Sequence, residues 1–308
     1  MVKVTFIVSD KDALQRVDKY LKKIMPTAPE NLIYKLLRTK DVRVNNKKVQ
    51  GDYILQESDV IFVFVTEAQA EEFFVPYTFK EVTPTFKLVY EDENIIAIHK
   101  PAGLLVHPTA QEKEMTLTNM VLTYLKRKGE FIETARGYIP SPVSRIDQDT
   151  DGIIVFAKKQ NVHQILANAF MTPNQVRRVY KAVVHGRIDK VEGTINLSLA
   201  KQKGKVVVDN EGRNATTFYR VEEKTSTKSL IEVELLTGRQ HQIRVHFQSI
   251  GHPLVGDQKY GPANESGALA LNAYSLTFNN LPSPLDYLNG KTFIADNTLK
   301  LKKRLGEK

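Results

Sequence analysis

Three aspartates stand at alternate positions in one short segment of this 308-residue chain, at Asp147, Asp149 and Asp151, and Gly152 follows them. This spacing matches the opening of a calcium-binding loop. Such a loop needs a bidentate glutamate at its twelfth position, and that position here is Lys158. It also needs a helix on each side, whereas the apolar run after Gly152 is typical of a buried strand. The segment therefore argues against a calcium site.

A second interpretation gives Asp147 a direct chemical role. Arg145 stands two residues before it, and the apolar run after Gly152 predicts that the segment leads into the core. A carboxylate beside a guanidinium stays ionised and fixed in place, which suits a nucleophile. The alternative is that the three carboxylates only decorate a solvated turn.

Other reaction classes lack their characteristic motifs. The sequence holds no phosphate-binding loop of the G-x-x-x-x-G-K-[ST] type, no G-x-G-x-x-G fingerprint and no G-x-S-x-G elbow. His241 and His246 do not have the spacing of a zinc protease motif. Cysteine is absent, which excludes disulfides, thiolate metal ligands and cysteine nucleophiles.

The elements that must position Asp147 alternate short strands with occasional helices from Phe86 onward. Strands outnumber helices and short turns join several of them, so we expect an α+β fold with a large, mixed and mainly antiparallel sheet. The predicted helices are Thr116–Lys128 and Asn161–Phe170. The predicted strands are Leu88–Tyr90, Ile95–Ile98, Leu104–Val106, Gly152–Lys158, Val179–Val184, Thr216–Glu223, Leu230–Leu236 and Ala268–Phe278.

The first 65 residues form a different pattern. Two short helices are expected near Ala13–Met25 and after Pro29, followed by the strand Val42–Val44, a turn and the buried strand Val60–Val65. Twelve basic residues stand against eight acidic ones, a net charge of +4, within a chain of net charge +9. A basic excess favours polyanionic partners, although a solvated helical surface would look the same.

The overall composition of the sequence predicts a cytoplasmic protein that does not associate with a membrane. Its apolar runs are too short to cross a bilayer, and its N-terminus lacks the apolar core of a signal peptide. Residues 66–85 hold four glutamates, two prolines and little periodicity, so they are expected to be a linker. This gives four expected segments, 1–65, the linker 66–85, a large domain 86–300 and a basic tail 301–308.

Five segments along the chain together resemble known families. Residues 16–60 are similar to the S4-like RNA-binding module, and the rest resembles the RluA-type pseudouridine synthases, motif by motif and in the same order. The matching stretches are His99–Pro108 (K-P-x-G-x-x-x-H-P), Ser144–Lys158 (H-R-L-D-x-x-T-S-G-L-L-x-x-A-K), Val179–Gly186 (Y-x-A-x-V-x-G) and Leu236–Asp257 (T-G-R-x-H-Q-I-R-x-H, then G-x-P-I-x-G-D).

The resemblance implies isomerisation of uridine to pseudouridine, either in ribosomal RNA, most simply that of the large subunit, or in transfer RNA. No metal or cofactor is implied, and we expect the enzyme to be a monomer. It assigns Asp147 as the nucleophile, Tyr180 as the aromatic side chain that packs on the base and takes the C5 proton, and Arg244 as the partner of Asp147. Arg145 would hold RNA around the extruded nucleotide, which must leave its stack to react. Lys35, Arg38 and Arg43 of the S4-like module would bind RNA as well. The alternative function is a non-catalytic RNA-binding or ribosome-assembly protein with the same fold.

The chain departs from the family pattern at four positions. Ser144 replaces a histidine, Gln148 a common basic residue, Asp151 a serine or threonine, and Asn272 a histidine. Asp151 adds a negative charge that Arg145 and Arg244 would have to offset. These departures bear on the subfamily and the RNA target rather than on the three expected catalytic residues.

Overall fold

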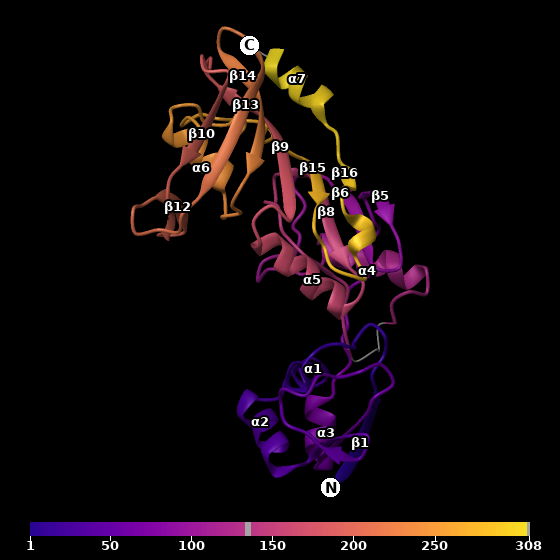
Figure 1. The fold of residues 1–308 in the computed structure, drawn as a ribbon. Coiled ribbons are helices and arrows are strands. Elements are labelled where there is room, and N and C mark those ends of the chain that lie inside the picture. The colour runs from indigo at the N-terminus through magenta and orange to yellow at the C-terminus, as the bar shows by residue number, and fades with distance from the viewer. Residues whose placement is uncertain (133–136, 307–308) are drawn as a thin grey trace.

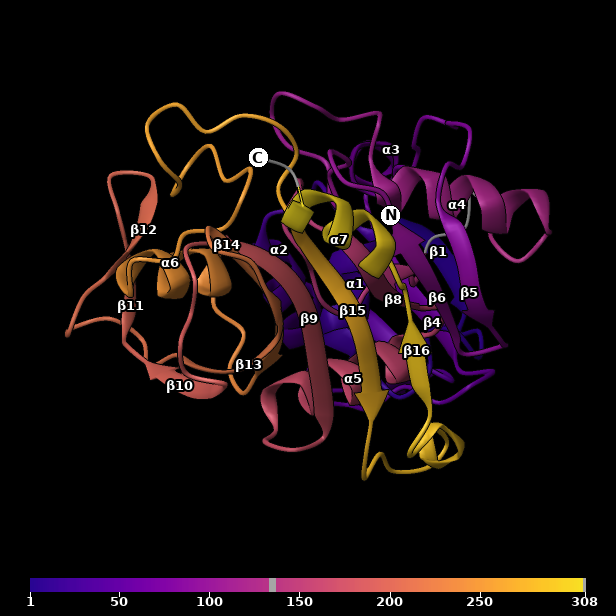
Figure 2. The ribbon, with the colours of Figure 1, turned by 90° about the horizontal axis from the view of Figure 1, so that it is seen from above.

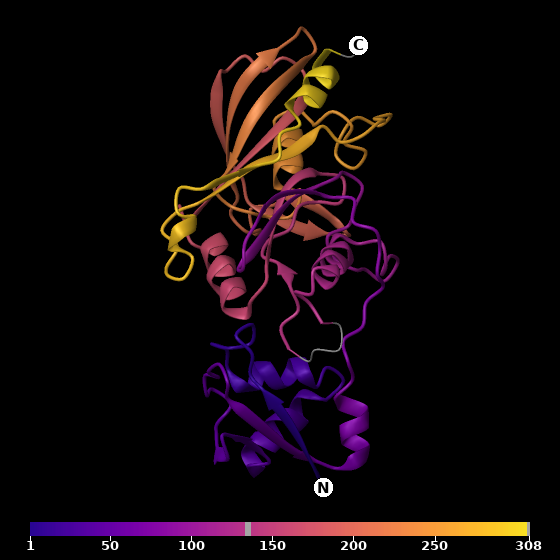
Figure 3. The ribbon, with the colours of Figure 1, turned by 90° about the vertical axis from the view of Figure 1, so that its right-hand side faces the viewer.

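The computed structural model of the chain describes residues 1–132 and 137–306. It contains a small sheet near the N-terminus and a large sheet from residue 87 onward, and these lie at opposite ends of the molecule (Figures 1 and 3). A separate two-stranded hairpin pairs β11 (Leu199–Gln202) with β12 (Lys205–Val208).

The N-terminal unit contains the two helices and the two strands that the sequence predicts, and an additional strand, β1, that was not predicted. Its antiparallel sheet has the order β1-β4-β2-β3, and the apolar side chains of two helices pack against the sheet. The helix expected near Ala13–Met25 is shorter, because Leu14 has a positive φ of 60° and the helix begins only at Val17. The elements are β1 (Val2–Ile7), α1 (Val17–Ile24), α2 (Glu30–Thr39), β2 (Val42–Val44), β3 (Lys47–Lys48) and β4 (Val60–Val65).

The expected linker contains a helix that the sequence reading missed. Thr66 and Gln69 form a capping box, which satisfies backbone N–H groups at the start of α3 (Glu67–Phe73). Phe73 and Phe74 at its end are buried in the hydrophobic core of the N-terminal unit. The extended part of the linker therefore begins only after Phe74.

The large sheet has ten strands, and its main path runs β10-β13-β14-β9-β15-β8-β6-β5. Its named strand pairs are antiparallel except for β15 with β8, so the expected mixed, mainly antiparallel sheet is confirmed. The strands are β5 (Lys87–Glu91), β6 (Ile95–Lys100), β7 (Ser141–Pro142), β8 (Asp151–Ala157), β9 (Val176–His185), β10 (Glu192–Asn196), β13 (Thr216–Lys224), β14 (Lys228–Leu235), β15 (Leu271–Phe278) and β16 (Thr292–Ile294).

Strand β8 is the centre of the core, and all seven of its residues are buried. Because side chains alternate along a strand, Ile154 and Phe156 pack with α4 (Leu117–Arg127). Ile153 and Val155 pack on the other face with α5 (Gln160–Met171). The continuous apolar run after Gly152 is therefore explained by helices on both faces of the sheet.

Gly152 allows β8 and β15 to meet. It pairs with Ala273, has a φ of +131°, and a Cβ atom added there would lie 2.3 Å from the Ala273 carbonyl oxygen. Only glycine tolerates both this backbone conformation and this approach. The contact brings the loop that carries Asp147 beside the strands of the other half of the sheet.

Two expectations need correction. Leu104–Val106 is not a strand, and only Leu105 forms an isolated bridge, with Thr116. The expected basic tail begins inside α7 (Thr298–Gly306), where Leu301 and Leu305 are buried and the helix packs on β9 and β14 (Figure 2). The last two positions of that tail, 307 and 308, lie outside the described residues.

Polar contacts join the two units directly. The backbone N–H of Gln160 donates to the carbonyl oxygen of Lys11 at 2.8 Å, and that of Tyr138 donates to the Asp12 carboxylate. The ammonium of Lys23 donates to the side chains of Gln15 and Gln160. These contacts fix the N-terminal unit against the start of α5.

Candidate active site

A cavity of about 1000 Å³ opens between the loop before β8, strand β9 and the loop that precedes α6 (Gln242–Ser249). Asp147, Arg145, Tyr180 and Arg244 all line it. These residues come from three segments far apart in the sequence, and the sheet order together with the Gly152 contact brings them to one place. The structure therefore brings together the three expected catalytic residues and Arg145.

Arg244 is the partner of Asp147. Its Nη1 atom donates to the Oδ2 atom of Asp147 at 3.3 Å, and the Arg244 side chain is 8% exposed. Its Nε and Nη2 atoms donate to the two carboxylate oxygens of the fully buried Asp257, at 2.8 and 2.7 Å. This paired arrangement fixes the plane of the guanidinium, so Arg244 can hold Asp147 in one orientation.

Asp257 was not assigned a role from the sequence. Burial raises the pKa of its carboxyl, but the hydrogen bonds and charge of Arg244, with the backbone N–H groups of Tyr260 and Lys259, outweigh this and leave the pKa below its ordinary value. Asp257 is therefore a permanently charged anchor for Arg244 at neutral pH. The sequence signal was present in the Gly256-Asp257 pair of the last motif, but its contact with Arg244 is a tertiary one.

His241 approaches Asp147 from the other side, with its Nε2 atom 3.8 Å from Oδ2. Burial lowers the pKa of His241, so the ring is neutral at neutral pH. Its Nδ1 atom lies 2.7 Å from the Tyr260 hydroxyl, which accepts from the Val206 backbone N–H at 3.1 Å. This contact with Tyr260 orients the imidazole ring beside Asp147.

Tyr180 lies on β9 and is half-buried within the cavity. Burial raises the pKa of its phenol to about 12, while the positive charge of Arg178 opposes the rise and the charge of Asp147 adds to it. The phenol is therefore protonated at neutral pH. It offers the cavity an aromatic face and one polar tip.

A buried lysine, Lys100, holds the loop that carries Asp147. The Nζ atom of Lys100 donates to the carbonyl oxygens of Pro101, Leu104 and Gln148 at 2.8 to 2.9 Å. Burial lowers the pKa of Lys100 to about 8, against the neighbouring aspartates that raise it. Three carbonyl acceptors match the three N–H groups of an ammonium, so Lys100 ties the residue after Asp147 to the core.

Two polar residues of α6, Gln242 and His246, form hydrogen bonds to strand β13. The amide of Gln242 donates to the Thr216 carbonyl oxygen and to the Thr217 hydroxyl, and His246 bonds to the same hydroxyl at 2.9 Å. Both side chains are buried. They fasten the start of α6 to β13 and so position Arg244, which lies between them in sequence.

Comparison with known proteins identifies the family of the chain that carries this site. The sequence model of the family described as RNA pseudouridylate synthase matches residues 94–249, which hold Asp147, Tyr180 and Arg244. An uncharacterised RNA pseudouridine synthase of Mycoplasma capricolum is 32% identical over 94% of this chain and 96% of its own length. The chain belongs to the RNA pseudouridylate synthase family. This synthase is also 33% identical to the ribosomal large subunit pseudouridine synthase C of Vibrio cholerae, over 84% of this chain and 81% of that protein.

Solved structures agree with the fold of this pseudouridine synthase. Human RNA pseudouridylate synthase domain containing 4 superposes with a TM-score of 0.56 at 21% identity, over 71% of this chain and 92% of its own. Human RNA pseudouridylate synthase domain containing 1 gives a TM-score of 0.54 at 18% identity, over 75% and 98%. The enzyme therefore has the pseudouridine synthase fold. Its family and its curated relatives show that it isomerises uridine in RNA.

Two details of the aspartate segment differ from expectation. Arg145 is exposed and makes no ion pair with Asp147 among the residues that the structure describes, so Arg244 alone supplies the paired guanidinium. Asp151 does not line the cavity and instead contacts Asn297 and His99. The added negative charge at position 151 is thus directed away from the site, which explains why the synthase tolerates it.

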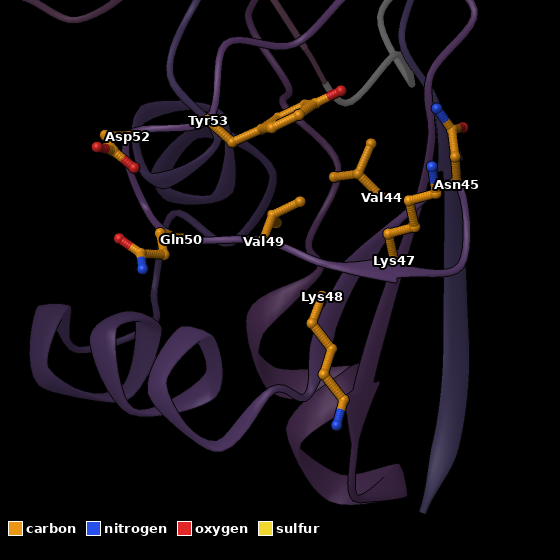
Figure 4. Close-up of a pocket in the computed structure, with 8 residues that line it drawn as sticks. All are labelled: Val44, Asn45, Lys47, Lys48, Val49, Gln50, Asp52 and Tyr53. Carbon is orange, nitrogen blue, oxygen red and sulfur yellow. The ribbon is translucent and has the colours of Figure 1, made fainter.

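The expected RNA-binding residues of the N-terminal unit lie outside the cavity. Lys35 and Arg38 are exposed on α2, and Arg43 on β2 lies over the Phe64 ring at 5.1 Å. A shallow hollow of about 460 Å³ lies next to β3 (Figure 4). It is lined by Val44, Asn45, Lys47, Lys48, Val49, Gln50, Asp52 and Tyr53.

Neither a metal cluster nor a membrane span is found in the part of the chain that the structure describes. No three His, Asp or Glu side chains of residues 1–132 and 137–306 are arranged to hold a metal ion. No helix among these residues is both long and apolar enough to cross a bilayer. Lys158, at the twelfth position of the calcium-like pattern, pairs with Glu91 and Glu130.

Proposed function

We propose that Asp147, Tyr180 and Arg244 carry the isomerisation, and that the substrate is a uridine in ribosomal RNA. The observation behind this is the ion pair of Arg244 with Asp147 inside a cavity that also holds the Tyr180 ring. An ionised carboxylate, a guanidinium fixed by Asp257 and an aromatic ring are what the reaction needs in one place. The large-subunit enzymes among the relatives favour ribosomal RNA over transfer RNA.

The reaction breaks the N1–C1′ bond, turns the detached base and joins C5 to C1′. Asp147 acts at the ribose as the bond breaks, and Arg244 holds its carboxylate in one orientation. Tyr180 packs against the uracil and accepts the C5 proton at its hydroxyl. Because burial raises the pKa of Tyr180 to about 12, the phenol gives up its own proton to solvent as the C5 proton arrives. N1 of the base, which has lost its bond to C1′, takes up a proton in turn, so the base gains at N1 the proton that it loses at C5.

The N-terminal unit is proposed to be an S4-like RNA-binding module. Lys35 and Arg38 lie three residues apart on one helix and are exposed, so both can reach a phosphate backbone. Arg43 and the hollow beside β3 extend the same unit. We further propose that the enzyme acts as a monomer in the cytoplasm and needs no metal or cofactor. Arg145 is proposed to bind the RNA at the mouth of the cavity.

The main test is tritium release from RNA that carries 5-³H-uridine, comparing Asp147→Asn with Asp149→Asn. Both variants remove one negative charge from the same loop, but Asp149 is exposed and does not line the cavity. Asp147→Asn should abolish release while RNA affinity stays within a few-fold, and Asp149→Asn should keep its activity. Tight RNA binding by a wild-type protein that releases no tritium from any RNA would instead support the non-catalytic alternative.

Two further measurements test the target and the N-terminal unit. Pseudouridines mapped in ribosomal and transfer RNA, from cells with and without the gene, should differ at a site in large-subunit RNA. Replacing Lys35 and Arg38 by glutamine should weaken RNA binding and reduce its salt dependence, because two phosphate contacts are lost. An unchanged affinity would refute the assignment of these two residues.

A further inference from the structure

Arg178 is a charged residue of the cavity that the reaction described above does not use. It lies on β9 two positions before Tyr180, so both side chains project from the same face of the strand. Both line the cavity together with Leu235 and Gly238. Arg178 is half-buried, unlike the exposed Arg145 at the mouth.

The hydrogen-bonding capacity of this guanidinium is mostly unused. Its Nη2 atom donates to the Leu235 carbonyl oxygen at 3.2 Å, and the group lies 6.0 Å from the Phe170 ring centre. The Nε atom is sealed from solvent without an acceptor. Within the described part of the chain, Nη1 has no acceptor either, and no carboxylate lies within 4 Å of the guanidinium.

Two neighbouring arginines of the cavity have carboxylate partners, which Arg178 lacks within the described residues. Arg177, the preceding residue on β9, pairs with Glu234 at 3.0 Å, and Arg244 pairs with both Asp257 and Asp147. Burial lowers the pKa of Arg178, and the opposing effect of Tyr180 is smaller than this loss of hydration. An arginine side chain nevertheless stays protonated, so the charge remains uncompensated.

Gly238 leaves space for the guanidinium of Arg178. A Cβ atom added at residue 238 would lie 2.5 Å from the Nη1 atom of Arg178. The φ angle of Gly238 is not in the left-handed region, so the backbone alone does not require glycine there. The missing side chain leaves room for the tip of Arg178.

We propose that Arg178 binds a phosphate of the target RNA strand, beside the nucleotide whose base packs against Tyr180. A permanent positive charge is best matched by a permanent negative one, and RNA brings one phosphate per nucleotide, whereas uracil is neutral until its bond to the ribose breaks. Arg178 and Tyr180 stand about 7 Å apart along the backbone of β9 and line the same cavity, so one nucleotide can contact both side chains. The inference rests on the proposed placement of the base at Tyr180.

The experiment measures Kd for a target-containing RNA fragment at several salt concentrations, and kcat at saturating RNA. Arg178→Gln is compared with Arg220→Gln, which removes the same charge from an exposed position outside the cavity. Arg178→Gln should weaken binding about 10-fold and reduce the slope of log Kd against log salt by about 0.7 to 0.9, the value of one phosphate contact. Its kcat should stay within about threefold, and Arg220→Gln should match the wild type in both quantities.

Two more variants distinguish charge from geometry. Arg178→Lys should keep the salt slope, because the charge remains, but lose about threefold in affinity since the planar donor pair is gone. Gly238→Ala keeps Arg178 and its charge but displaces its tip, so it should weaken binding by less than Arg178→Gln. Thermal unfolding of each variant shows whether it is folded.

A lower kcat with unchanged Kd and salt slope would overturn the phosphate assignment in favour of a contact with the base. Unchanged Kd, slope and kcat in folded Arg178→Gln would show that no RNA group binds there. Both outcomes presuppose an active wild-type enzyme. Failure of the proposed function is seen separately, as absence of tritium release from the wild type.

Discussion

Replacing Asp257 by asparagine tests how the catalytic carboxylate is held in place. Asp257 touches neither the base nor the ribose in the proposed reaction, and it acts only through Arg244. Asparagine has nearly the same shape but no charge, and the NH2 that replaces one carboxylate oxygen donates and cannot accept a hydrogen bond. At least one of the two bonds from Arg244, at 2.8 and 2.7 Å, is therefore lost.

The magnitude follows from the burial of the pair. The side chains of Arg244 and Asp257 are 8% and 0% exposed, and removing one partner of such a pair costs about 3 to 5 kcal/mol of unfolding free energy. For a unit of this size that corresponds to a fall in Tm of about 10 °C. A displacement of Arg244 by about 1 Å would move Asp147 with it, and misplacement of this order lowers kcat about 100-fold.

The assay combines tritium release at saturating RNA with thermal unfolding followed by circular dichroism. Asp189→Asn is the control, because Asp189 is a surface carboxylate that is 91% exposed and lies 3.6 Å from Arg187. It should leave kcat and Tm unchanged. RNA affinity of Asp257→Asn should remain within a few-fold of the wild type, since the residue does not contact RNA.

The same variant has a pH signature. Because the folded-state pKa of Asp257 lies below its ordinary value, its charged form stabilises the fold at every pH above about 4, and this contribution is lost as the pH falls through the folded-state pKa. The stability difference between wild type and Asp257→Asn should be constant from pH 8 to 5 and shrink below about pH 4. A variant that loses stability but keeps kcat within threefold would refute the positioning role of Asp257.

Three other substitutions probe the supports of the site. Lys100→Met leaves three buried carbonyl oxygens without their donor, so it should cost about 3 kcal/mol in urea unfolding and lower kcat. Normal stability would contradict this. Gly152→Ala places a methyl group against the Ala273 carbonyl in a backbone conformation with φ of +131°, and soluble expression should fall along with Tm. Tyr260→Phe removes the hydrogen bond that orients the His241 ring beside Asp147, so kcat should fall about 10-fold with little change in RNA affinity. Equal kcat values would show that this hydrogen bond does not support the site.

Local sequence patterns predicted most of the elements that carry the site. Strand β8 and helices α4 and α5 follow from apolar periodicity, and Lys158 together with the apolar run after Gly152 argued against a calcium loop. The missed helix α3 is short and polar, with only Phe73 and Phe74 to fasten it. Such an element shows little periodicity because its burial depends on a neighbouring unit rather than on its own pattern.

The sequence by itself determined the fold class, the family resemblance and the residue types of the site, because these depend on local spacing and on motif order. The resemblance already assigned Arg244 as the partner of Asp147, but tertiary structure was needed to show the contact itself and the absence of an ion pair from the nearer Arg145 within the described residues. Tertiary structure alone decided that Asp151 is directed to Asn297 and His99, and that Asp257 anchors Arg244. Electrostatic effects depend on distance and burial, and only the folded sheet with its Gly152 contact fixes these for residues about 100 positions apart.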